Sequence, residues 1–510
     1  MNTSGNSSGI LQPQGSRTRH SPNGGRIHRY FARAQQRALE VGIASALDVL
    51  GRASEDNYGR LAAVFEKFAH DDNKRMVAGW VRRYLSPGAP GTPWLKHLLT
   101  SVHPNVRRRY VAQFVTYVVF HDYYARYRLA DGREIPVPAL VVISPTMRCN
   151  LKCIGCYAGN YEKKDDLTPE EVGDILAQAR DLGIRFFVVT GGEPLMYEAL
   201  FDIFEKFSDC AFQFYTSGHL MTRERAQRIV ELGNVVPAVS VEGFAEQTNY
   251  RRGPGGFDRV MRAFDYLREA GALYAFSVTA TRLNLDAVTS DEFFQLMVDK
   301  GCHYGYYFSY IPVGRNPDLS LMPTPEERNR LRIAVNRFRR DYPMLVADFW
   351  NDGALVEGCL SAGRKYIHIN NKGDVEPCVF AHFAVDNIRE KPLTECLASD
   401  FFAAMRKAAP FGRNLLRPCP IIDHPKVLRT LAQKYAARPT HEGAESLFAE
   451  LAPHLDSYAD GLRQVYDPVF AAEYRWAAQL HSNPRYDLTA HPPRGLADEP
   501  AVEAEAAVAR

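Results

Sequence analysis

The sequence predicts an α/β fold with a parallel sheet that is curled into a full or partial barrel. From residue 140 onward, short apolar runs alternate with longer stretches that have the periodicity of amphipathic helices. Alternation of this kind is typical of β/α units, in which right-handed crossovers make successive strands parallel. Six runs have the character of strands: Leu140–Ser144, Phe186–Thr190, Phe212–Thr216, Ala238–Val241, Tyr274–Thr279 and Tyr304–Tyr310.

Two of the intervening helices have clear boundaries. Thr168-Pro-Glu-Glu171 is a capping box with proline at the first helical position, and the helix that it starts is expected to end near Gly183. A second helix is predicted from about Phe257 to Gly271. In barrel folds the chemistry collects at the C-terminal ends of the strands, so the residues that follow each strand are the candidates for a site.

The segments on either side of the β/α region differ from it in composition. Residues 1–26 are rich in Ser, Gly, Asn and Pro and are expected to form a disordered basic tail. Residues 27–137 have helical periodicity and predict an N-terminal helical region. Helices are predicted again over residues 426–484, and residues 485–510 are expected to be a disordered tail.

The composition is that of a soluble globular protein, with 46% hydrophobic and 24% charged residues. No uninterrupted apolar run reaches the roughly 18 residues that a membrane span needs. The net charge of +3 argues neither for nor against nucleic acid, and no nucleic-acid partner is expected. Because no secretory signal is seen, we expect the nine cysteines to stay reduced in the cytoplasm rather than form a disulfide framework.

Three cysteines, Cys149, Cys153 and Cys156, follow the first predicted strand with C-x3-C-x2-C spacing. A loop with this spacing can bring three thiolates to one face of an iron–sulfur cubane, which normally takes four thiolates. Three ligands would leave one iron open to a substrate or cofactor. Zinc prefers four closed ligands, and the nearest later cysteine is Cys210. The spacing therefore favours an iron–sulfur site, with zinc as the alternative.

The second predicted strand ends in Thr190-Gly-Gly-Glu-Pro194. Two glycines allow a ligand to approach the backbone closely, and Glu193 can receive an ammonium group. On its own, a Gly-Gly-Glu-Pro motif is more often a simple turn than a ligand-binding segment. Gly191 lies 35 residues after Cys156 (191 minus 156), which is one β/α unit further along the chain. The motif and the cysteines are thus expected at the same rim of the barrel.

In these residues, together with aromatic Tyr157, the sequence resembles the radical S-adenosylmethionine (SAM) superfamily, over residues 138–315. The resemblance implies a partial (β/α)6 TIM-like barrel and a [4Fe-4S] cluster held by the three cysteines. It also implies that the open iron chelates the amino and carboxylate groups of SAM. One electron would then cleave SAM to methionine and a 5′-deoxyadenosyl radical, which abstracts a hydrogen atom from the substrate.

The resemblance also implies contacts to SAM at other strand ends. Family members often have Thr-Asn-Gly and Ser-hydrophobic-Asp-Gly where this chain has Ser217 and Glu242 in place of Asn and Asp. For each of these polar strand-end residues, a hydrogen bond within the fold is as good an interpretation as a contact to SAM. The implied SAM-binding residues are Tyr157 beside the adenine, Gly191, Gly192, Glu193, Pro194, Thr216 and Ser240.

A second set of cysteines, Cys359, Cys378 and Cys419, lies beyond the predicted barrel. The first two flank a predicted hairpin whose turn is Asn370–Asp374, so they are expected to come together. For any one of them, a buried structural cysteine is the alternative. Cys396 is a less convincing ligand, and Cys210 and Cys302 are interpreted as structural.

The spacing of Cys359, Gly373 and Cys378 resembles the start of the SPASM and twitch extensions of the same superfamily. The later cysteine run of a full SPASM domain is absent. The resemblance therefore implies a twitch-like module over residues 351–425 with one auxiliary [4Fe-4S] cluster. A helical connection over residues 316–350 would join it to the barrel.

The residues that suggest a substrate are aromatic and basic. The sixth strand carries four tyrosines, Phe349 and Trp350 follow later, and Arg251 and Arg252 suit a phosphate or carboxylate. These features favour a lipid or prenyl phosphate. The basic and aromatic stretch 106–127 would suit contact with the inner face of a membrane. For the aromatic residues, packing in the core is the alternative. For the stretch 106–127, the alternative is a helix packed against the barrel.

Two other functions stay open. SPASM and twitch enzymes often modify ribosomal peptides, but those usually have an N-terminal winged-helix element, and residues 27–137 show no convincing β-wing. A non-catalytic iron–sulfur electron-transfer or zinc protein would not need Gly191–Pro194. The expected partners are a small-molecule, lipid or peptide substrate and a flavodoxin- or ferredoxin-type electron donor.

Overall fold

The computed structural model covers most of the chain. The predicted tail 485–510 lies outside the described residues, as does most of the predicted tail 1–26 and much of the segment from 27 to 80. The described residues are 19–20, 38, 40–51, 54, 55, 58, 59, 79, 81–120, 125–158 and 165–481.

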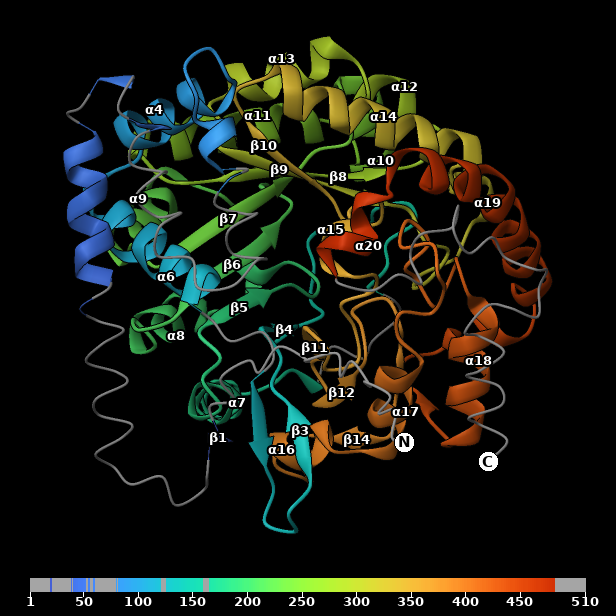
Figure 1. Cartoon of the computed structure of the whole chain (residues 1–510). Helices are drawn as coiled ribbons and strands as arrows, with labels where there is room; N and C mark the ends of the chain where they lie inside the picture. Colours follow the sequence, from blue (N-terminus) through green and yellow to red (C-terminus); the bar gives the residue numbers. More distant parts are fainter. Residues whose placement is uncertain are drawn as a thin grey trace, which may run out of the picture.

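A mixed sheet with the strand order β10-β9-β8-β7-β6-β5-β4-β11-β12-β14 forms the centre of the molecule (Figure 1). All six strands predicted for the barrel are present, and each pairs in parallel with the next. Tyr304 and Tyr306 of β9 each donate a hydrogen bond to Gln213 Oε1 of β6 at 3.1 Å, across two intervening strands. The sheet is therefore curled around these side chains. The six strands are β4 (Leu140–Ile143), β5 (Phe186–Val189), β6 (Ala211–Thr216), β7 (Val235–Ser240), β8 (Ala275–Ala280) and β9 (Tyr304–Ser309).

One more parallel strand extends each side of this partial barrel. Strand β10 (Leu345–Asp348) pairs with β9, and β11 (Tyr366–Ile369) pairs with β4. The predicted helical connection over 316–350 contains α14 (Pro325–Asp341), but its last residues, Leu345–Asp348, form strand β10 instead of a helix. The predicted hairpin is confirmed, since β12 (Asp374–Glu376) pairs antiparallel with β11.

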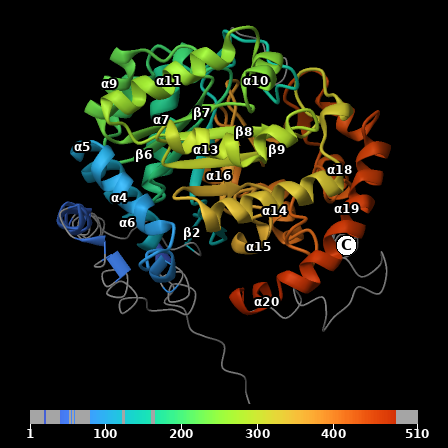
Figure 2. The ribbon, with the colours of Figure 1, turned by 90° about the horizontal axis from the view of Figure 1, so that it is seen from above.

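Helices cover the outer face of the barrel, as Figure 2 shows from above. The capping box of α7 is confirmed: Thr168 N donates to Glu171 Oε2 at 2.8 Å, and Glu171 N donates to Thr168 Oγ1 at 3.2 Å. The helices of this layer are α7 (Pro169–Asp181), α8 (Leu200–Lys206), α9 (Arg223–Leu232), α10 (Ala245–Arg252), α11 (Gly256–Ala270), α12 (Leu285–Val288), α13 (Asp291–Asp299) and α14 (Pro325–Asp341).

The N-terminal helices pack against the barrel, on the side opposite the C-terminal helices in both views. Trp94 Nε1 donates to His303 O at 2.7 Å, and the Tyr110 amide donates to Gly233 O at 2.9 Å. Tyr110 and Tyr117 are buried, which favours packing over membrane contact for the part 106–117 of the predicted membrane-contact stretch. No described helix is long and apolar enough to cross a membrane. The helices are α4 (Gly91–Ser101), α5 (Pro104–Val106), the π-helix η2 (Arg107–Val111) and α6 (Ala112–Phe120).

The N-terminal region also contains a small sheet, which the prediction of a helical region over residues 27–137 did not include. Strands β2 (Arg126–Arg128) and β3 (Glu134–Pro136) form an antiparallel hairpin, and β1 (Arg19–His20) pairs in parallel with β2. Three-residue strands with alternating charges have no apolar run to detect. The Asp131-Gly132 pair in the turn is the signal that could have found the hairpin.

The C-terminal part combines short strands with helices. It begins with the short helix α15, which the β11–β12 hairpin follows. The later helices pack beside α14 (Figure 1). The helices predicted after residue 426 are present. The elements are α15 (Gly353–Val356), β13 (Phe383–Ala384), β14 (Asp386–Asn387), α16 (Leu393–Leu397), α17 (Asp400–Ala408), α18 (Pro425–Lys434), β15 (Arg438–Pro439), α19 (Ala452–Glu473) and α20 (Trp476–Leu480), with the short 3-10 helix η6 (Ala444–Phe448). Two other 3-10 helices, η4 (Pro194–Met196) and η5 (Leu319–Leu321), lie earlier in the chain, after β5 and β9.

A buried ion pair ties the barrel layer to the segment that carries Cys419. Arg328 of α14 and Asp423 have no exposed side-chain surface, and Arg328 Nη1 lies 2.5 Å from Asp423 Oδ1. Arg328 also donates to Leu416 O at 2.9 Å, and Asp423 accepts from the Cys419 amide at 2.8 Å. The pair therefore fixes this segment against the barrel.

We expect Asp423→Ala to destabilise the protein by about 3–5 kcal/mol, because it leaves the Arg328 charge buried without its partner. Thermal unfolding followed by circular dichroism would measure the effect. Asp286→Ala is the matched control, since it breaks the exposed Arg330–Asp286 pair on the same helix and should change stability far less. Equal effects of the two substitutions would contradict the role of the buried pair.

Candidate active site

The three cysteines of the first motif lie in the loop that leaves the C-terminal end of β4. Each is half-buried. Cys149 Sγ accepts a hydrogen bond from the Leu151 amide at 3.4 Å. Burial raises the pKa of the Cys149 thiol to about 11. Binding of a metal at this thiol therefore requires the loss of a proton.

The two glycines after β5 support the segment that leads into Cys149. A Cβ atom on Gly191 would lie 2.3 Å from Thr146 O, and one on Gly192 would lie 2.2 Å from Arg148 O. The amides of Gly192 and Glu193 donate to these same carbonyl oxygens, at 3.0 and 2.8 Å. Carbonyl oxygens of the chain itself, and not a ligand, therefore occupy the space that the two glycines leave open.

Glu193 joins the ends of β5 and β6. Its buried carboxylate accepts from Thr216 Oγ1 at 2.7 Å, from Ser217 N at 2.8 Å and from Ser217 Oγ at 2.7 Å. The Leu195 amide donates to the same carboxylate at 3.2 Å. The structure therefore brings together the predicted residues Glu193 and Thr216, and adds Ser217 to them.

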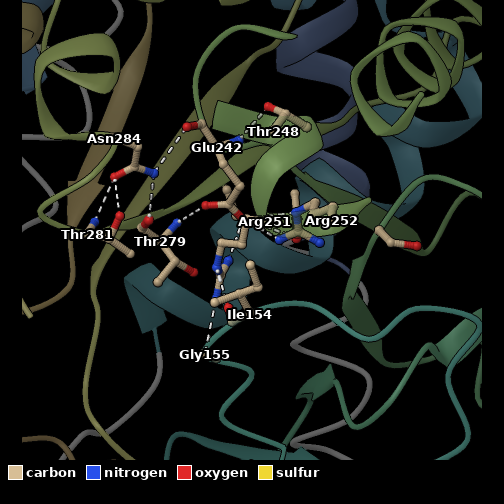
Figure 3. A network of polar contacts seen from close by, with 12 residues as sticks. Ile154, Gly155, Glu242, Thr248, Arg251, Arg252, Thr279, Thr281 and Asn284 are labelled. Carbon is tan, nitrogen blue, oxygen red and sulfur yellow. Dashed lines mark hydrogen bonds and ion pairs between the residues drawn. The ribbon is translucent and has the colours of Figure 1, made fainter. Parts of the chain in front are cut away.

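A second carboxylate, Glu242 after β7, organises two arginines (Figure 3). Its Oε1 accepts from Arg251 Nη1 at 2.5 Å and from Arg252 Nε at 2.9 Å. Its Oε2 accepts from the Thr279 amide at 3.2 Å. Both guanidinium groups are therefore paired, and the interpretation of Arg251 and Arg252 as anchors of a substrate phosphate is not supported.

Arg251 also holds the cysteine loop directly. Its Nε donates to Ile154 O at 3.1 Å and its Nη2 donates to Gly155 O at 3.3 Å, as Figure 3 shows. The Ile154 amide donates back to Arg251 O at 3.0 Å. Burial raises the pKa of the Cys153 thiol, and the nearby Arg252 and Arg251 charges oppose that rise. Two cations against one carboxylate thus leave net positive charge beside Cys153, which reduces but does not cancel the effect of burial on the pKa of its thiol.

The loop after β9 supports the other end of the cysteine loop. The Arg315 amide donates to Cys156 O at 3.0 Å, and a Cβ on Gly314 would lie 2.3 Å from Tyr157 O. The Tyr157 hydroxyl contacts Thr190 Oγ1, and burial raises the pKa of Tyr157 to about 12. Arg251, Gly314 and Arg315 were not predicted to act here. Their contacts go to backbone atoms of a loop distant in sequence, which leave no local pattern.

Ser240 and Pro194 lie at strand ends on the same rim. Ser240 Oγ lies 3.1 Å from Ser277 Oγ on the neighbouring strand β8. Pro194 is buried and starts the 3-10 helix η4 directly after Glu193. Ser240 therefore has the strand-end hydrogen bond that was its alternative interpretation.

The auxiliary cysteines Cys359, Cys378 and Cys419 are brought together around Tyr366. The Tyr366 hydroxyl donates to Cys378 Sγ at 2.8 Å. Burial, together with the proximity of Cys359, raises the pKa of Cys378 to about 12. Cys359 has the same influence on Cys419, whose pKa is raised chiefly by burial.

Cys396 does not join this group. Its thiol donates to Lys391 O at 3.6 Å and its charge neighbours are Asp386 and Lys391. Within the part of the chain that the structure describes, no three His, Cys, Asp or Glu side chains are arranged to hold a single metal ion.

Five aromatic rings join the two cysteine loops, and we refer to them as the aromatic wall. Tyr157 contacts Phe380 with ring centroids 5.3 Å apart, and Phe380 contacts Trp350 at 5.5 Å. Phe349 contacts Trp350 at 5.4 Å and Phe308 at 5.2 Å. Trp350 is buried, whereas Phe349 is 36% exposed. The wall thus presents a partly open apolar surface beside both cysteine sets.

Of the tyrosines of β9, Tyr306 contacts this wall, since its ring is stacked on Phe308 with ring centroids 5.9 Å apart. Tyr304 and Tyr306 face Gln213 inside the barrel, and Tyr307 is fully buried with its hydroxyl donating to Val288 O at 2.8 Å. Core packing, the alternative interpretation of these aromatic residues, is therefore the better account of Tyr307.

We expect Gly192→Ala to lower the iron bound after anaerobic reconstitution by about half, because its Cβ displaces Arg148 and Cys149 and leaves the auxiliary site intact. Iron analysis with circular dichroism on the same sample would separate loss of iron from loss of fold. Gly173→Ala on α7 is the control, since its Cβ would meet only Lys206 Nζ at 3.4 Å. Full iron content in Gly192→Ala would contradict the proposed support of the loop.

Comparison with known proteins places this arrangement in a family. The model of the radical SAM superfamily matches residues 143–297, and that of an iron–sulfur cluster-binding domain, SPASM, matches residues 359–420. The chain is 24% identical over 331 residues to the AdoMet-dependent heme synthase of Methanosarcina barkeri, covering 59% of this chain and 93% of the relative.

Two further similarities lie in the same region. The PqqA peptide cyclase of Streptomyces rochei is 28% identical over 314 residues, which is 56% of this chain and 82% of the relative. The crystal structure of Streptococcus suis SuiB bound to S-adenosylmethionine has a TM-score of 0.47 and 20% identity, covering 53% of this chain and 68% of that one. The cofactors of the protein are [4Fe-4S] clusters and S-adenosylmethionine. The chain is an enzyme that belongs to the radical SAM superfamily and carries a C-terminal SPASM-type iron–sulfur module.

Proposed function

We propose that Cys149, Cys153 and Cys156 hold the cluster whose open iron binds SAM, and that the enzyme abstracts a hydrogen atom from its substrate. The observation that carries the proposal is the support of this loop by Gly192, Arg251 and, at its other end, the Arg315 amide. When bound and reduced by one electron, the cluster supplies the cleavage of SAM to methionine and a 5′-deoxyadenosyl radical.

The residues around this loop would orient SAM. Glu193 and Thr216 are hydrogen-bonded to each other beside the cysteine loop, and the Tyr157 ring lies against Thr190 at the end of β5. These contacts support a preorganised rim whose groups do not move when the cofactor binds. The SAM-binding residues that we propose are Tyr157, Gly191, Gly192, Glu193, Pro194, Thr216 and Ser240.

We assign the auxiliary cluster to Cys359, Cys378 and Cys419. Their grouping around Tyr366 supports this set, and the separate environment of Cys396 argues against including it. A cluster at this place would lie across the aromatic wall from the first one. An electron donor of the flavodoxin or ferredoxin type would supply the electron.

We propose a small molecule with an apolar body, such as a lipid or prenyl-type molecule, as the substrate. The partly exposed aromatic wall between the two cysteine sets supports this class. The heme synthase relative, whose named product is a small molecule, supports it too. The pairing of Arg251 and Arg252 with Glu242 argues against recognition of a phosphate at this rim.

A peptide is the second candidate substrate, and one observation favours it. The β1–β2–β3 sheet supplies the kind of N-terminal β element whose expected absence had counted against a peptide. The relative named PqqA peptide cyclase points to the same class. A peptide would bind by adding a strand to this small sheet.

The reaction is tested by anaerobic reconstitution followed by addition of dithionite and SAM. We expect 5′-deoxyadenosine and about eight iron atoms per chain, since two cubanes are present. Cys149→Ala should abolish 5′-deoxyadenosine, whereas Cys396→Ala should retain both values. No 5′-deoxyadenosine from the unaltered protein would refute the radical reaction and favour a non-catalytic electron-transfer protein.

The substrate class is tested by comparing extracts from cells with and without the protein. Lipid and peptide fractions would be analysed by mass spectrometry, and each would be added to the reconstituted enzyme. We expect a lipid-fraction component to raise 5′-deoxyadenosine formation and to be altered in mass. Stimulation by the peptide fraction alone would replace the small-molecule proposal with the peptide one.

A further inference from the structure

We propose that Tyr366 is a positioning residue of the auxiliary site, whose phenol donates a hydrogen bond to the Cys378 thiolate and so sets the reduction potential of the auxiliary cluster. The inference rests on the proposed function, because that assigns Cys378 as a cluster ligand. It adds a residue that belongs to the barrel sheet rather than to the cysteine loops.

The geometry at Tyr366 is that of a fixed hydrogen-bond donor. Tyr366 is the first residue of β11, its side chain is 4% exposed, and its hydroxyl lies 2.8 Å from Cys378 Sγ. Burial keeps water from competing for this hydrogen bond. Cys359 and Cys419 lie close enough to Tyr366 for their charges, like that of Cys378, to raise the pKa of its phenol.

The backbone of Tyr366 is held from both sides. On one side β11 pairs in parallel with β4, which places Tyr366 opposite Leu140. On the other side the Tyr366 amide donates to Leu360 O at 3.1 Å, and Gly363 N donates to Tyr366 O at 3.0 Å. The segment between Cys359 and β11 is therefore closed into a compact turn, and the backbone from which the Tyr366 ring extends toward Cys378 is fixed by the sheet.

Tyr366 adds a side-chain donor to a backbone donor at the same sulfur. Cys378 Sγ also accepts from the Phe380 amide at 3.4 Å, and Cys419 Sγ accepts from the Ile421 amide at 3.4 Å. The phenol contact is the shortest of these three. A cysteine with two donors carries more of its negative charge in hydrogen bonds than one with a single donor.

This arrangement has a direct redox consequence. One-electron reduction makes the cluster and its thiolate ligands more negative, and hydrogen bonds to the sulfurs stabilise the reduced state more than the oxidised one. Tyr366 should therefore make reduction of the auxiliary cluster more favourable. Its removal should lower the reduction potential without removing a ligand.

The test uses the full chain with Cys149→Ala, Cys153→Ala and Cys156→Ala, so that the auxiliary cluster alone gives a signal. Tyr366→Phe is compared with this parent in a redox titration followed by electron paramagnetic resonance. We expect the equilibrium for reduction to fall by about tenfold, which corresponds to about 59 mV for one electron. Iron content and circular dichroism should stay those of the parent.

Tyr274→Phe is the matched control. It removes another buried tyrosine hydroxyl, which donates to Lys300 O at 2.6 Å next to the start of β8. Strands β7, β6, β5 and β4 separate β8 from β11 in the sheet. The reduction potential of the auxiliary cluster in Tyr274→Phe should equal that in the parent.

Three outcomes would overturn the inference. An unchanged potential in Tyr366→Phe would remove the role of the hydrogen bond. Loss of iron from Tyr366→Phe alone would instead make the phenol a ligand. A parent that binds no iron would refute the assignment of Cys359, Cys378 and Cys419, and this result appears before any tyrosine variant is compared.

Discussion

The support of one irregular loop by backbone contacts is the constraint on which the rest of the structure depends. Cys149, Cys153 and Cys156 lie outside any helix or strand, so their positions are set by contacts with other loops. The loops after β5 and β9 and the arginine at the end of α10 each bond to carbonyl oxygens of this segment. Because the parallel strands end together, these distant segments reach the same place.

Glu242 shows how charge is used for geometry rather than for stability. It is fully buried and receives two guanidinium groups, an arrangement whose desolvation offsets much of its Coulombic attraction. The ion pair with Glu242 instead fixes the orientation of Arg251. The remaining N–H groups of Arg251 then point at Ile154 and Gly155. The excess positive charge then lies where an anionic cluster is expected, so one device orients the loop and favours its charged state.

The sequence was informative where the signal is local. The six apolar runs, the capping box at Thr168 and the two cysteine motifs are each contained within a few residues, and the comparisons bear out the family that they indicate. Strand β10 and the β2–β3 hairpin are too short or too polar to have a period. The roles of Arg251 and Arg315 could not be predicted, because their partners are backbone atoms far away in sequence.

The pairing of β11 with β4 has a consequence for the order of assembly on the ribosome. The two strands begin 226 residues apart (366 minus 140), so the edge of β4 stays without this neighbour until the later half of the chain has been made. An unpaired, apolar strand edge is prone to associate with other chains. The segment that completes the sheet is thus also the segment that carries the second cysteine set. A nascent chain that stalls before residue 366 would present an aggregation-prone edge at β4.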